Sequence, residues 1–522
     1  MKRVLLLCWL TLGAAQASEA LVAKRFMVAA AHPLAAEAGA EVLKRGGSAL
    51  DAAVAVQVVL GLVEPESSGI GGGAFLLHWS ESEKRLRSYD GRETAPAAAK
   101  PDRFLKDGKP MAFLEAAVGG RSVGVPGVVR MLEVAHQRHG RLAWSGLFDA
   151  AIRIAEAGFE PSAKFRAALE RAPELSRYYA QPRVVNREYA DTLRTIASGG
   201  ARVFYEGEIA RDMVAAVRAH AKPGDLTEDD LRAYGALERE PVCGPYRGWR
   251  ICSMGPPSSG GVAVLQILGL LERTRFARAP PQSADALHYF AEAGKLAYAD
   301  RARYLGDPDF VPVPVRGLLG TSYLDRRAKL ISDKAMAIAP PGDAEAGTSH
   351  FSIVDARGDI VSMTTTIEAA FGSRIMVRGF LLNNQLTDFD FAPGGPNQVA
   401  AGKRPRSSMA PAIVFRGGEP VLVVGSPGGS MIINYVAKAL VGTLDWGLDI
   451  QAAIELPNFG SRNGPTLIEQ GSRYEGLAPS LAERGHQTDR IPLQSGLHGI
   501  ERVPGGWRGG ADPRRDGAVR GE

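Results

Sequence analysis

The stretch that most constrains the fold of this chain begins at Gly347. Two short runs of alternating apolar residues, Phe351–Val354 and Ile360–Met363, flank the turn-forming sequence DARGD at 355–359. Strand-like runs on either side of such a turn predict a β-hairpin. The hairpin implies an antiparallel sheet that contains this part of the chain.

The position of the turn sets which residues face each other across the hairpin. Thr348 and Thr366 are equally distant from Arg357. If the turn centres on Arg357, these two threonines form a cross-strand pair, with Cβ atoms about 4.5–5.5 Å apart. The sequence therefore predicts two hydroxyl groups in contact at the open end of the hairpin.

The N-terminus has the features of an export signal. Lys2 and Arg3 precede the apolar run Val4–Leu12, and the sequence AQA at 15–17 matches a small-residue cleavage pattern. We expect residues 1–17 to be removed, although a buried N-terminal helix is the alternative. No other apolar run reaches the ~20 residues that span a bilayer. We therefore expect a mature periplasmic or secreted protein without a membrane span.

Two cysteines remain after removal of this segment, Cys243 and Cys252. They flank GPYRGWRI, and a two-residue turn at Arg247-Gly248 places them opposite each other. An oxidising compartment favours a disulfide over two buried thiols. The chain contains no HExxH or comparable ligand pattern, so we expect neither a metal site nor another cofactor.

The charge pattern argues against nucleic-acid binding. The 522-residue chain carries a net charge of +5, and its basic residues are scattered.

The sequence GIGGGA at 69–74 matches a relaxed dinucleotide fingerprint. The dinucleotide fingerprint normally follows a strand and begins a helix. In this chain the order is reversed: a buried helix, predicted at Ala49–Val63, precedes the glycines, and a strand, predicted at Ala74–Trp79, follows them. We interpret the glycines as a tight turn.

Two further glycine- and serine-rich corners deserve a structural prediction. The sequence GSPGGS at 425–430 lies between the strand predicted at Val421–Val424 and the helix predicted from Met431. Such a corner exposes backbone N–H groups that suit an oxyanion, but a packing turn is equally compatible.

In MGPPSSGG, Ser258 or Ser259 is a reasonable helix cap. Neither lies in a G-x-S-x-G elbow, so a serine nucleophile of that type is not supported.

Many ordered segments together resemble the gamma-glutamyltransferase (gamma-glutamyl transpeptidase) family of N-terminal-nucleophile hydrolases. The resemblance covers nearly all of the mature chain. Its motifs are GGSALDAAVAV (46–56), GIGGGAF (69–75), the Arg92 segment, GVPG (124–127), GPPSSGG (255–261), AYADRARYLGDPDFV (297–311), TSHFSIVD (348–355), LLNNQLTDF (381–389), KRPRSSM (403–409) and GSPGGS (425–430).

The resemblance implies an α/β (α+β) fold, namely a four-layer αββα sandwich. It also implies a precursor that cuts itself before a threonine, here at the Gly347–Thr348 bond. The products would be a large subunit, residues 18–347, and a small subunit, residues 348–522, which together form one compact domain. The freed α-amine would then act as the base that a threonine hydroxyl needs.

The resemblance also assigns roles in the site. Thr348 matches the nucleophile and Thr366 its hydrogen-bonding partner, while Gly428 and Gly429 match the oxyanion-hole donors. The groups that match contacts to the substrate α-carboxylate are Arg92, Ser407 and Ser408, and those that match contacts to the α-ammonium are Gln385 and Asp388. Glu368 departs from the family pattern, because it occupies the place of an asparagine that contacts the substrate's amino end.

These roles imply cleavage of γ-glutamyl compounds such as glutathione, with the acyl group passed to water or to an amino acid or peptide. The segment between Asp388 and Ser407 is short, which predicts a site without a covering lid. Two alternatives remain: a glutaryl-cephalosporin (β-lactam) acylase of the same fold, and an unprocessed, non-catalytic binding protein. Asp388 argues against the first, and the intact pair of Thr348 and Thr366 argues against the second.

Overall fold

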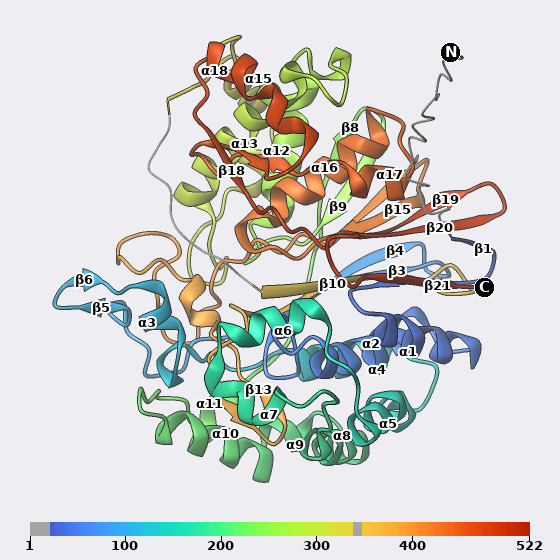
Figure 1. The fold of residues 1–522 in the computed structure, drawn as a ribbon, viewed down its shortest axis with the longest axis vertical. Coiled ribbons are helices and arrows are strands. Elements are labelled where there is room, and N and C mark those ends of the chain that lie inside the picture. Colours follow the sequence, from blue (N-terminus) through green and yellow to red (C-terminus); the bar gives the residue numbers. More distant parts are fainter. Residues whose placement is uncertain (1–20, 338–346) are drawn as a thin grey trace, which may run out of the picture.

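Two seven-stranded antiparallel sheets pack face to face at the centre of the molecule, between two layers of helices (Figure 1). This computed structural model describes residues 21–337 and 347–522. The predicted signal segment, residues 1–17, lies outside the described residues. The first sheet has the order β1 (Val22–Ala23), β20 (Gly506–Ala511), β19 (His498–Val503), β15 (Glu419–Gly425), β14 (Ala412–Arg416), β9 (Trp249–Ser253) and β8 (Val242–Tyr246).

The second sheet contains the predicted hairpin at its centre. Its order is β21 (Ala518–Gly521), β2 (Met27–Ala30), β10 (Gly347–Val354), β11 (Ile360–Glu368), β3 (Gly73–Ser80), β4 (Arg85–Gly91) and β7 (Leu237–Arg239). Each sheet therefore combines strands that precede position 347 with strands that follow it. Smaller sheets pair β5 (Leu105–Lys106) with β6 (Lys109–Pro110), β12 (Met376–Val377) with β13 (Phe380–Leu381), and β17 (Thr466–Glu469) with β16 (Phe459–Gly460) and β18 (Thr488–Ile491).

Alternating side chains divide the buried residues of the second sheet between two layers. Along β2, Met27 packs between the two sheets, whereas Val28 packs against the helices. This is the period of two that a strand imposes on its side chains. Trp79 and Phe415 meet between the sheets, with ring centroids 5.0 Å apart. The four-layer αββα architecture implied by the resemblance is confirmed.

The helical layer on the second sheet is built around α2 (Ala49–Val63). Every residue of α2 is buried, which matches its nearly continuous apolar sequence. Ser48 and Asp51 form a capping box at its start. Helices that share this hydrophobic core or extend it are α1 (Pro33–Lys44), α4 (Val128–His139), α5 (Asp149–Ala157), α6 (Ala163–Glu170), α7 (Ser176–Tyr179), α8 (Arg187–Gly199), α9 (Arg202–Tyr205), α10 (Glu208–Ala219) and α11 (Glu228–Ala233).

The helical layer on the first sheet is built around α12 (Gly260–Glu272), α13 (Ala284–Tyr304) and α16 (Ile432–Leu444). Ser259 occupies the N-cap position of α12 but makes no capping bond; its hydroxyl donates instead to the Ser407 carbonyl, at 2.6 Å. Of the two proposed caps, the Ser258 hydroxyl accepts the N–H of Gly260, the first residue of α12, at 3.2 Å, whereas Ser259 makes no such bond because the adjacent 407–409 loop competes for its hydroxyl. The remaining helices are α3 (Phe113–Ala117), α14 (Val315–Leu318), α15 (Thr321–Ala328), α17 (Ile450–Glu455) and α18 (Ala478–Glu483).

The β10–β11 hairpin has the predicted register from Ser349 onwards, where Ser349 pairs with Thr365. An irregularity before Ser349 lets Gly347 pair with Glu368. The irregularity leaves Thr348 outside the regular ladder, yet its side chain still meets Thr366. The predicted contact between the two threonines is therefore confirmed, although the strand end is less regular than the spacing suggested.

The glycine turn at 69–74 joins α2 to β3, so the rejected dinucleotide interpretation has no structural support. A Cβ at Gly72 would lie 2.1 Å from the Thr366 carbonyl oxygen. Only glycine allows this close approach of the turn to the end of β11. The turn thus helps to position Thr366.

The Cys243–Cys252 disulfide closes the β8–β9 hairpin, in which these two residues are paired directly. Arg247 and Gly248 form its turn, both with positive φ, as a two-residue hairpin turn requires. The disulfide lies at the edge of the first sheet.

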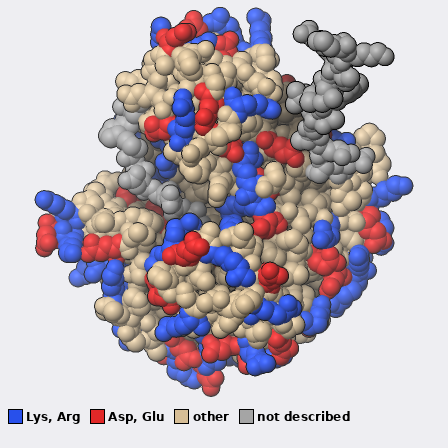
Figure 2. Space-filling model, in the orientation of Figure 1, with Lys and Arg blue, Asp and Glu red and all other residues tan. Residues whose placement is uncertain are grey.

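Basic and acidic side chains are interspersed over the face of the molecule seen in Figure 2. Within residues 21–337 and 347–522, the helices lack the combination of length and apolar character that a membrane crossing demands.

Candidate active site

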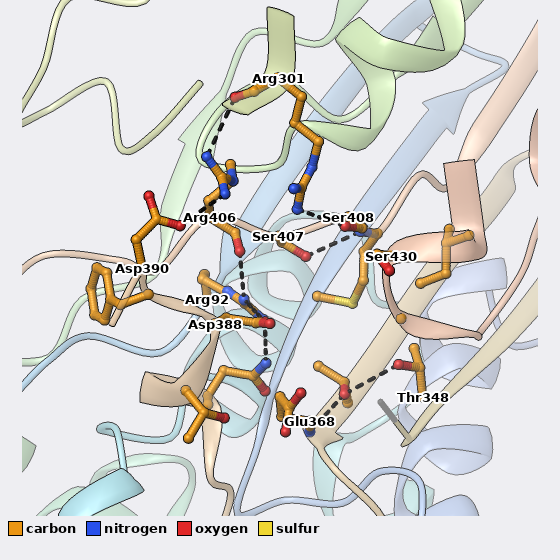
Figure 3. A pocket seen from close by; sticks show the side chains of 17 residues that line it. Arg92, Arg301, Thr348, Glu368, Asp388, Asp390, Arg406, Ser407, Ser408 and Ser430 are labelled. Atoms are coloured by element: carbon orange, nitrogen blue, oxygen red, sulfur yellow. Dashed lines mark hydrogen bonds and ion pairs between the residues drawn. The ribbon is translucent and has the colours of Figure 1, made fainter. Parts of the chain in front are cut away.

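Thr348 lines a pocket of about 190 Å³ that lies at the ends of β10 and β11 (Figure 3). Its side chain is almost fully buried, with 2% of the residue exposed. Nine of the ten residues predicted for catalysis and substrate binding line this pocket, and Gly428 adjoins the ninth, Gly429. The lining members are Arg92, Thr348, Thr366, Glu368, Gln385, Asp388, Ser407, Ser408 and Gly429.

The Thr348 hydroxyl donates a hydrogen bond to Oγ1 of Thr366, at 3.3 Å. That Thr366 oxygen also accepts the backbone N–H of Glu368, at 2.8 Å. The second bond fixes the Thr366 side chain at the strand end, so Thr366 presents its oxygen to Thr348. Arg515 holds the other side of Thr348, because its Nη1 donates to the Thr348 carbonyl oxygen, at 3.1 Å.

A buried polar network anchors the residue that follows Thr348. The Ser349 hydroxyl donates to Oε2 of Glu64, at 2.8 Å, and Lys164 donates to the other Glu64 oxygen, at 2.7 Å. Burial opposes ionisation of Glu64, but Lys164 and Arg515 outweigh it and lower the pKa of this carboxyl below its usual value. An ionised Glu64 is a strong acceptor, and it therefore fixes the backbone beside Thr348.

Gly428 and Gly429 form the turn between β15 and α16, as predicted. Gly428 has φ +124°, a conformation that an L side chain rarely adopts. Within the described part of the chain, neither backbone N–H has a hydrogen-bond acceptor. Gly429 lines the pocket that contains Thr348. This geometry favours the oxyanion interpretation over a simple packing turn.

Arg92 follows β4 and is fully buried. Its Nε donates to the carbonyl of Pro405, at 3.0 Å, and its Nη2 contacts both Asp388 and the Arg406 carbonyl. Its Nη1 has no hydrogen-bond acceptor within the described residues, although a Glu93 oxygen lies 3.7 Å away. The surface ion pair that is the ordinary role of a lone arginine does not apply to Arg92.

Glu368 is buried at the end of β11 with φ +81°. This left-handed conformation is strained for a side chain of this size and is typical of functional sites. Asn384 donates to its Oε2, at 2.5 Å, whereas Oε1 has no hydrogen-bond partner among the described residues. Burial, reinforced by the nearby Asp388 carboxylate, raises the pKa of Glu368 well above its usual value.

Asp388 is the more accessible of the two acids. It ends the short 3-10 helix Gln385–Asp388, and Gln385 donates to its Oδ2, at 2.8 Å. The segment that follows folds back as a compact loop: Asn397 donates to the Asp388 carbonyl, at 2.7 Å, and accepts from the Arg406 backbone, at 2.8 Å. The loop lines the pocket through Phe389 and Asp390.

The structure adds residues that the sequence did not assign to the site. Arg301 from α13 and Arg406 from the 404–409 loop line the upper side of the pocket in Figure 3. Arg301 lies within the motif AYADRARYLGDPDFV, which supported the resemblance without indicating a role. Glu64 and Arg515 act on the backbone beside Thr348 from opposite ends of the chain. The other added lining residues are Thr387, Phe389, Asp390, Met409, Ser430 and Ile432.

One group of potential metal ligands occurs in the described part of the chain: His288, Glu292 and His486. The two histidines hydrogen-bond to each other, with Nδ1 of His288 2.7 Å from Nε2 of His486. Lys295 lies 2.8 Å from a Glu292 oxygen, and its positive charge opposes a cation there. These contacts occupy the ligand atoms, so we assign this group no metal-binding role.

A four-layer αββα sandwich with a threonine hydroxyl at the start of an inner strand defines the N-terminal-nucleophile hydrolase class. The family model for gamma-glutamyltranspeptidase matches residues 35–522. The chain belongs to the gamma-glutamyltranspeptidase family.

Three relatives illustrate the range of this family. The chain is 38% identical to "Glutathione hydrolase proenzyme" of Bacillus subtilis (strain 168), with 96% of this chain and 92% of that protein covered. It is 35% identical to "Acylase ACY 1 proenzyme" of Pseudomonas sp. (strain V22), with 93% and 91% covered. The crystal structure of a cephalosporin acylase from Bacillus halodurans has a TM-score of 0.89 at 28% identity, with 99% of both chains covered.

Proposed function

We propose that this protein is a self-processing gamma-glutamyltransferase and glutathione hydrolase. One observation carries the proposal. The Thr348 hydroxyl contacts Thr366 in a pocket that it shares with the Gly429 turn and with both acidic and basic side chains. A nucleophile, oxyanion donors and groups for both charges of an amino acid thus surround one space.

Maturation precedes the reaction: hydrolysis of the Gly347–Thr348 peptide bond consumes one water and leaves a carboxyl group on Gly347 and a free α-amine on Thr348. This amine accepts the hydroxyl proton while Oγ1 adds to the γ-carbonyl carbon of the substrate. The N–H groups of Gly428 and Gly429 stabilise the negative oxygen that develops. The C–N bond then breaks, and the leaving amine takes up the proton.

The γ-glutamyl ester on Thr348 is resolved in a second step. Water, or the amine of an amino acid or peptide, adds to the ester carbonyl and loses a proton to the Thr348 α-amine. The ester C–O bond breaks, and Oγ1 recovers its proton. The products are glutamate or a new γ-glutamyl amide, and the enzyme is regenerated.

The charged groups of the pocket suit the zwitterionic end of a glutamyl substrate. Arg92, Ser407 and Ser408 would receive the α-carboxylate. Asp388 and Glu368, with Gln385, would receive the α-ammonium. Arg92 and Asp388 contact each other in this structure, so a bound zwitterion would replace one internal ion pair with two contacts of the same kind.

A β-lactam acylase is the second candidate, and the similarity to Acylase ACY 1 and to the cephalosporin acylase favours it. A glutaryl group has no α-ammonium, so it gains nothing from Asp388. We therefore expect faster hydrolysis of γ-glutamyl-p-nitroanilide than of glutaryl-p-nitroanilide. Preference for the glutaryl compound would establish the acylase instead.

The Thr348→Ala variant tests the proposed nucleophile and the proposed subunits, residues 18–347 and 348–522. The wild-type protein should give two bands on a denaturing gel, and sequencing of the smaller band should begin at Thr348. Thr348→Ala should give one uncut band. Cleavage of the variant at the same bond would exclude Thr348. A wild-type protein that stays uncut and inactive would instead indicate a binding protein.

We also propose that the protein is exported and that residues 1–17 are its signal peptide. The basic start, the apolar run and the AQA sequence support this proposal. Fractionation of cells that express the full chain should place the mature protein outside the cytoplasm, with an N-terminus near Ser18.

A further inference from the structure

Arg301 reaches the pocket from α13 and bridges two serine hydroxyls. Its Nε donates to Oγ of Ser259, at 2.7 Å, and its Nη2 donates to Oγ of Ser408, at 2.9 Å. Figure 3 shows its side chain pointing toward Ser408, on the side of that serine opposite to Arg92 and Asp388. Two donor atoms of one planar group therefore fix the guanidinium in a single orientation.

Arg301 has no carboxylate within 4.0 Å among the described residues, unlike the other arginines of the pocket. The acidic side chains nearby are engaged elsewhere. Asp388 contacts Arg92, and Asp390 contacts Arg406, at 3.1 Å. Burial and the neighbouring Arg406 lower the pKa of Arg301 to about 9. A partly buried guanidinium that has only neutral hydrogen-bond partners is stabilised by an anionic ligand that neutralises it.

The direction of these hydrogen bonds determines what Ser408 offers to a ligand. A guanidinium can only donate, so Ser408 must accept from Arg301, and its own hydroxyl proton remains free to donate. Ser407 is arranged in the same way, since its oxygen accepts the backbone N–H of Met409, at 3.1 Å. Within the described part of the chain, neither hydroxyl proton has an acceptor. Both serines are thus prepared to donate to an anion in the pocket.

We propose that Arg301 is a positioning residue for the substrate carboxylate: it holds Ser408 as a hydrogen-bond donor and supplies the positive charge behind it. The inference rests on the proposed function, because that function places a carboxylate at Ser407 and Ser408. It adds that this subsite depends on a residue of α13 that does not itself touch the reacting atoms. Arg301 should therefore affect substrate binding more than the chemical step.

The test compares Arg301→Gln with the wild type on two substrates. With γ-glutamyl-p-nitroanilide we expect KM to rise roughly ten-fold or more, as for a lost charge-assisted contact, while kcat changes little. With 4-aminobutyryl-p-nitroanilide, which keeps the amine but lacks the carboxylate, the two proteins should have equal kcat/KM. Arg303→Gln is the matched control, because Arg303 is an exposed arginine of the same helix; it should behave as wild type.

Two further variants separate positioning from folding or charge alone. Arg301→Lys keeps the charge, but an ammonium cannot reproduce the fixed fork between Ser259 and Ser408, so KM should recover only in part. In a double-mutant cycle, Arg301→Gln should add little to the KM of Ser408→Ala. Full rescue by lysine, or independent effects in the cycle, would overturn the positioning role.

The outcomes also separate this inference from the proposed function. A processed wild-type protein that hydrolyses neither substrate would refute the proposed function and the inference with it. A wild-type protein that hydrolyses γ-glutamyl-p-nitroanilide, with an unchanged KM in Arg301→Gln, would refute the inference alone. Thermal unfolding and the two-band pattern on a gel report whether each variant folds and matures.

Discussion

Oγ1 of Thr348 lies 3.3 Å from Oγ1 of Thr366, at the open end of one hairpin. The two residues come from adjacent strands, and the Glu368 N–H orients the second hydroxyl. Thr366 therefore positions the proposed nucleophile through a side-chain contact just beyond the last regular pair of the hairpin, Ser349 and Thr365.

Replacement of Thr366 by valine should remove this contact with little change in shape. We expect kcat/KM for γ-glutamyl-p-nitroanilide to fall about a hundred-fold, in the range typical of lost proton-handling groups. Thr366→Ser keeps the oxygen and should retain most of the activity. Equal rates for Thr366→Val and the wild type, measured on processed protein, would show that the contact has no catalytic importance.

Gly428→Ala should disturb the proposed oxyanion hole. A Cβ at Gly428 would lie 2.5 Å from Cε2 of Tyr435, and φ there is +124°. The turn must therefore shift, and the Gly429 N–H moves with it. We expect kcat to fall about 10²–10³-fold, as for a lost oxyanion donor.

Gly447→Ala is the control for backbone strain at the Gly428 turn. Gly447 also has a positive φ, +64°, but a Cβ there meets nothing within 4 Å. It should lower stability without changing kcat. If the two alanine variants had the same kcat, the turn would have no role in the reaction.

Glu368 should give the reaction a pH dependence. Burial and the nearby Asp388 raise the pKa of Glu368, so below that pKa the group is neutral and cannot attract an ammonium. The value of kcat/KM for a γ-glutamyl substrate should therefore rise as pH rises through the pKa of Glu368. Glu368→Gln keeps the size and a hydrogen bond to Asn384 but cannot ionise, so this rise should disappear. An identical pH profile in the variant would contradict the assignment.

The same group affects stability in the opposite direction. Because its pKa is raised in the folded protein, the folded state binds more protons than the unfolded state above the ordinary glutamate pKa of about 4.3. The free energy of unfolding should therefore fall as pH rises from that value through the folded pKa. Glu368→Gln should reduce this fall, as denaturant titrations at several pH values can show.

The Cys243–Cys252 disulfide should contribute to stability but not to catalysis. It closes a loop with a sequence separation of nine residues, for which chain entropy predicts about 2–3 kcal/mol. The double variant Cys243→Ser/Cys252→Ser should lose up to this amount in chemical unfolding. Its KM and kcat should match the wild type, because the hairpin is at a sheet edge outside the pocket. A loss of activity in a fully folded variant would contradict this separation.

The sequence predicted those features that depend on local patterns. The turn at Asp355–Asp359 and the alternating strands around it determine the hairpin register. The buried helix Ala49–Val63 was predicted from its nearly continuous apolar sequence. The catalytic and substrate-binding roles of the pocket residues were predicted from the family resemblance instead, because each of these residues lies in a segment that matches a family motif.

The features that the sequence did not predict depend on contacts between distant segments. The irregular strand end at Gly347 occurs together with the left-handed conformation of Glu368. Neither a glycine nor a glutamate at these positions predicts such a conformation from the sequence alone. The sequence left the cap of α12 open between Ser258 and Ser259; Ser258 bonds the Gly260 N–H, because the Ser259 hydroxyl donates to the Ser407 carbonyl of a distant loop. The sequence did not assign Arg301 to the site, because its contact with Ser408 depends on how α13 packs against the 404–409 loop. No local pattern encodes these neighbours.

Each central sheet combines strands from both sides of position 347, and β10 is bonded to β2 on one side and to β11 on the other. If the Gly347–Thr348 bond is cut as proposed, folding would precede the cut, because each sheet needs strands from both sides of this bond. After the cut, the backbone hydrogen bonds between strands and the hydrophobic cores shared by the two pieces would hold them together, and the broken peptide bond would contribute nothing to their association. The mature enzyme would then be a heterodimer that cannot exchange its halves without unfolding both sheets.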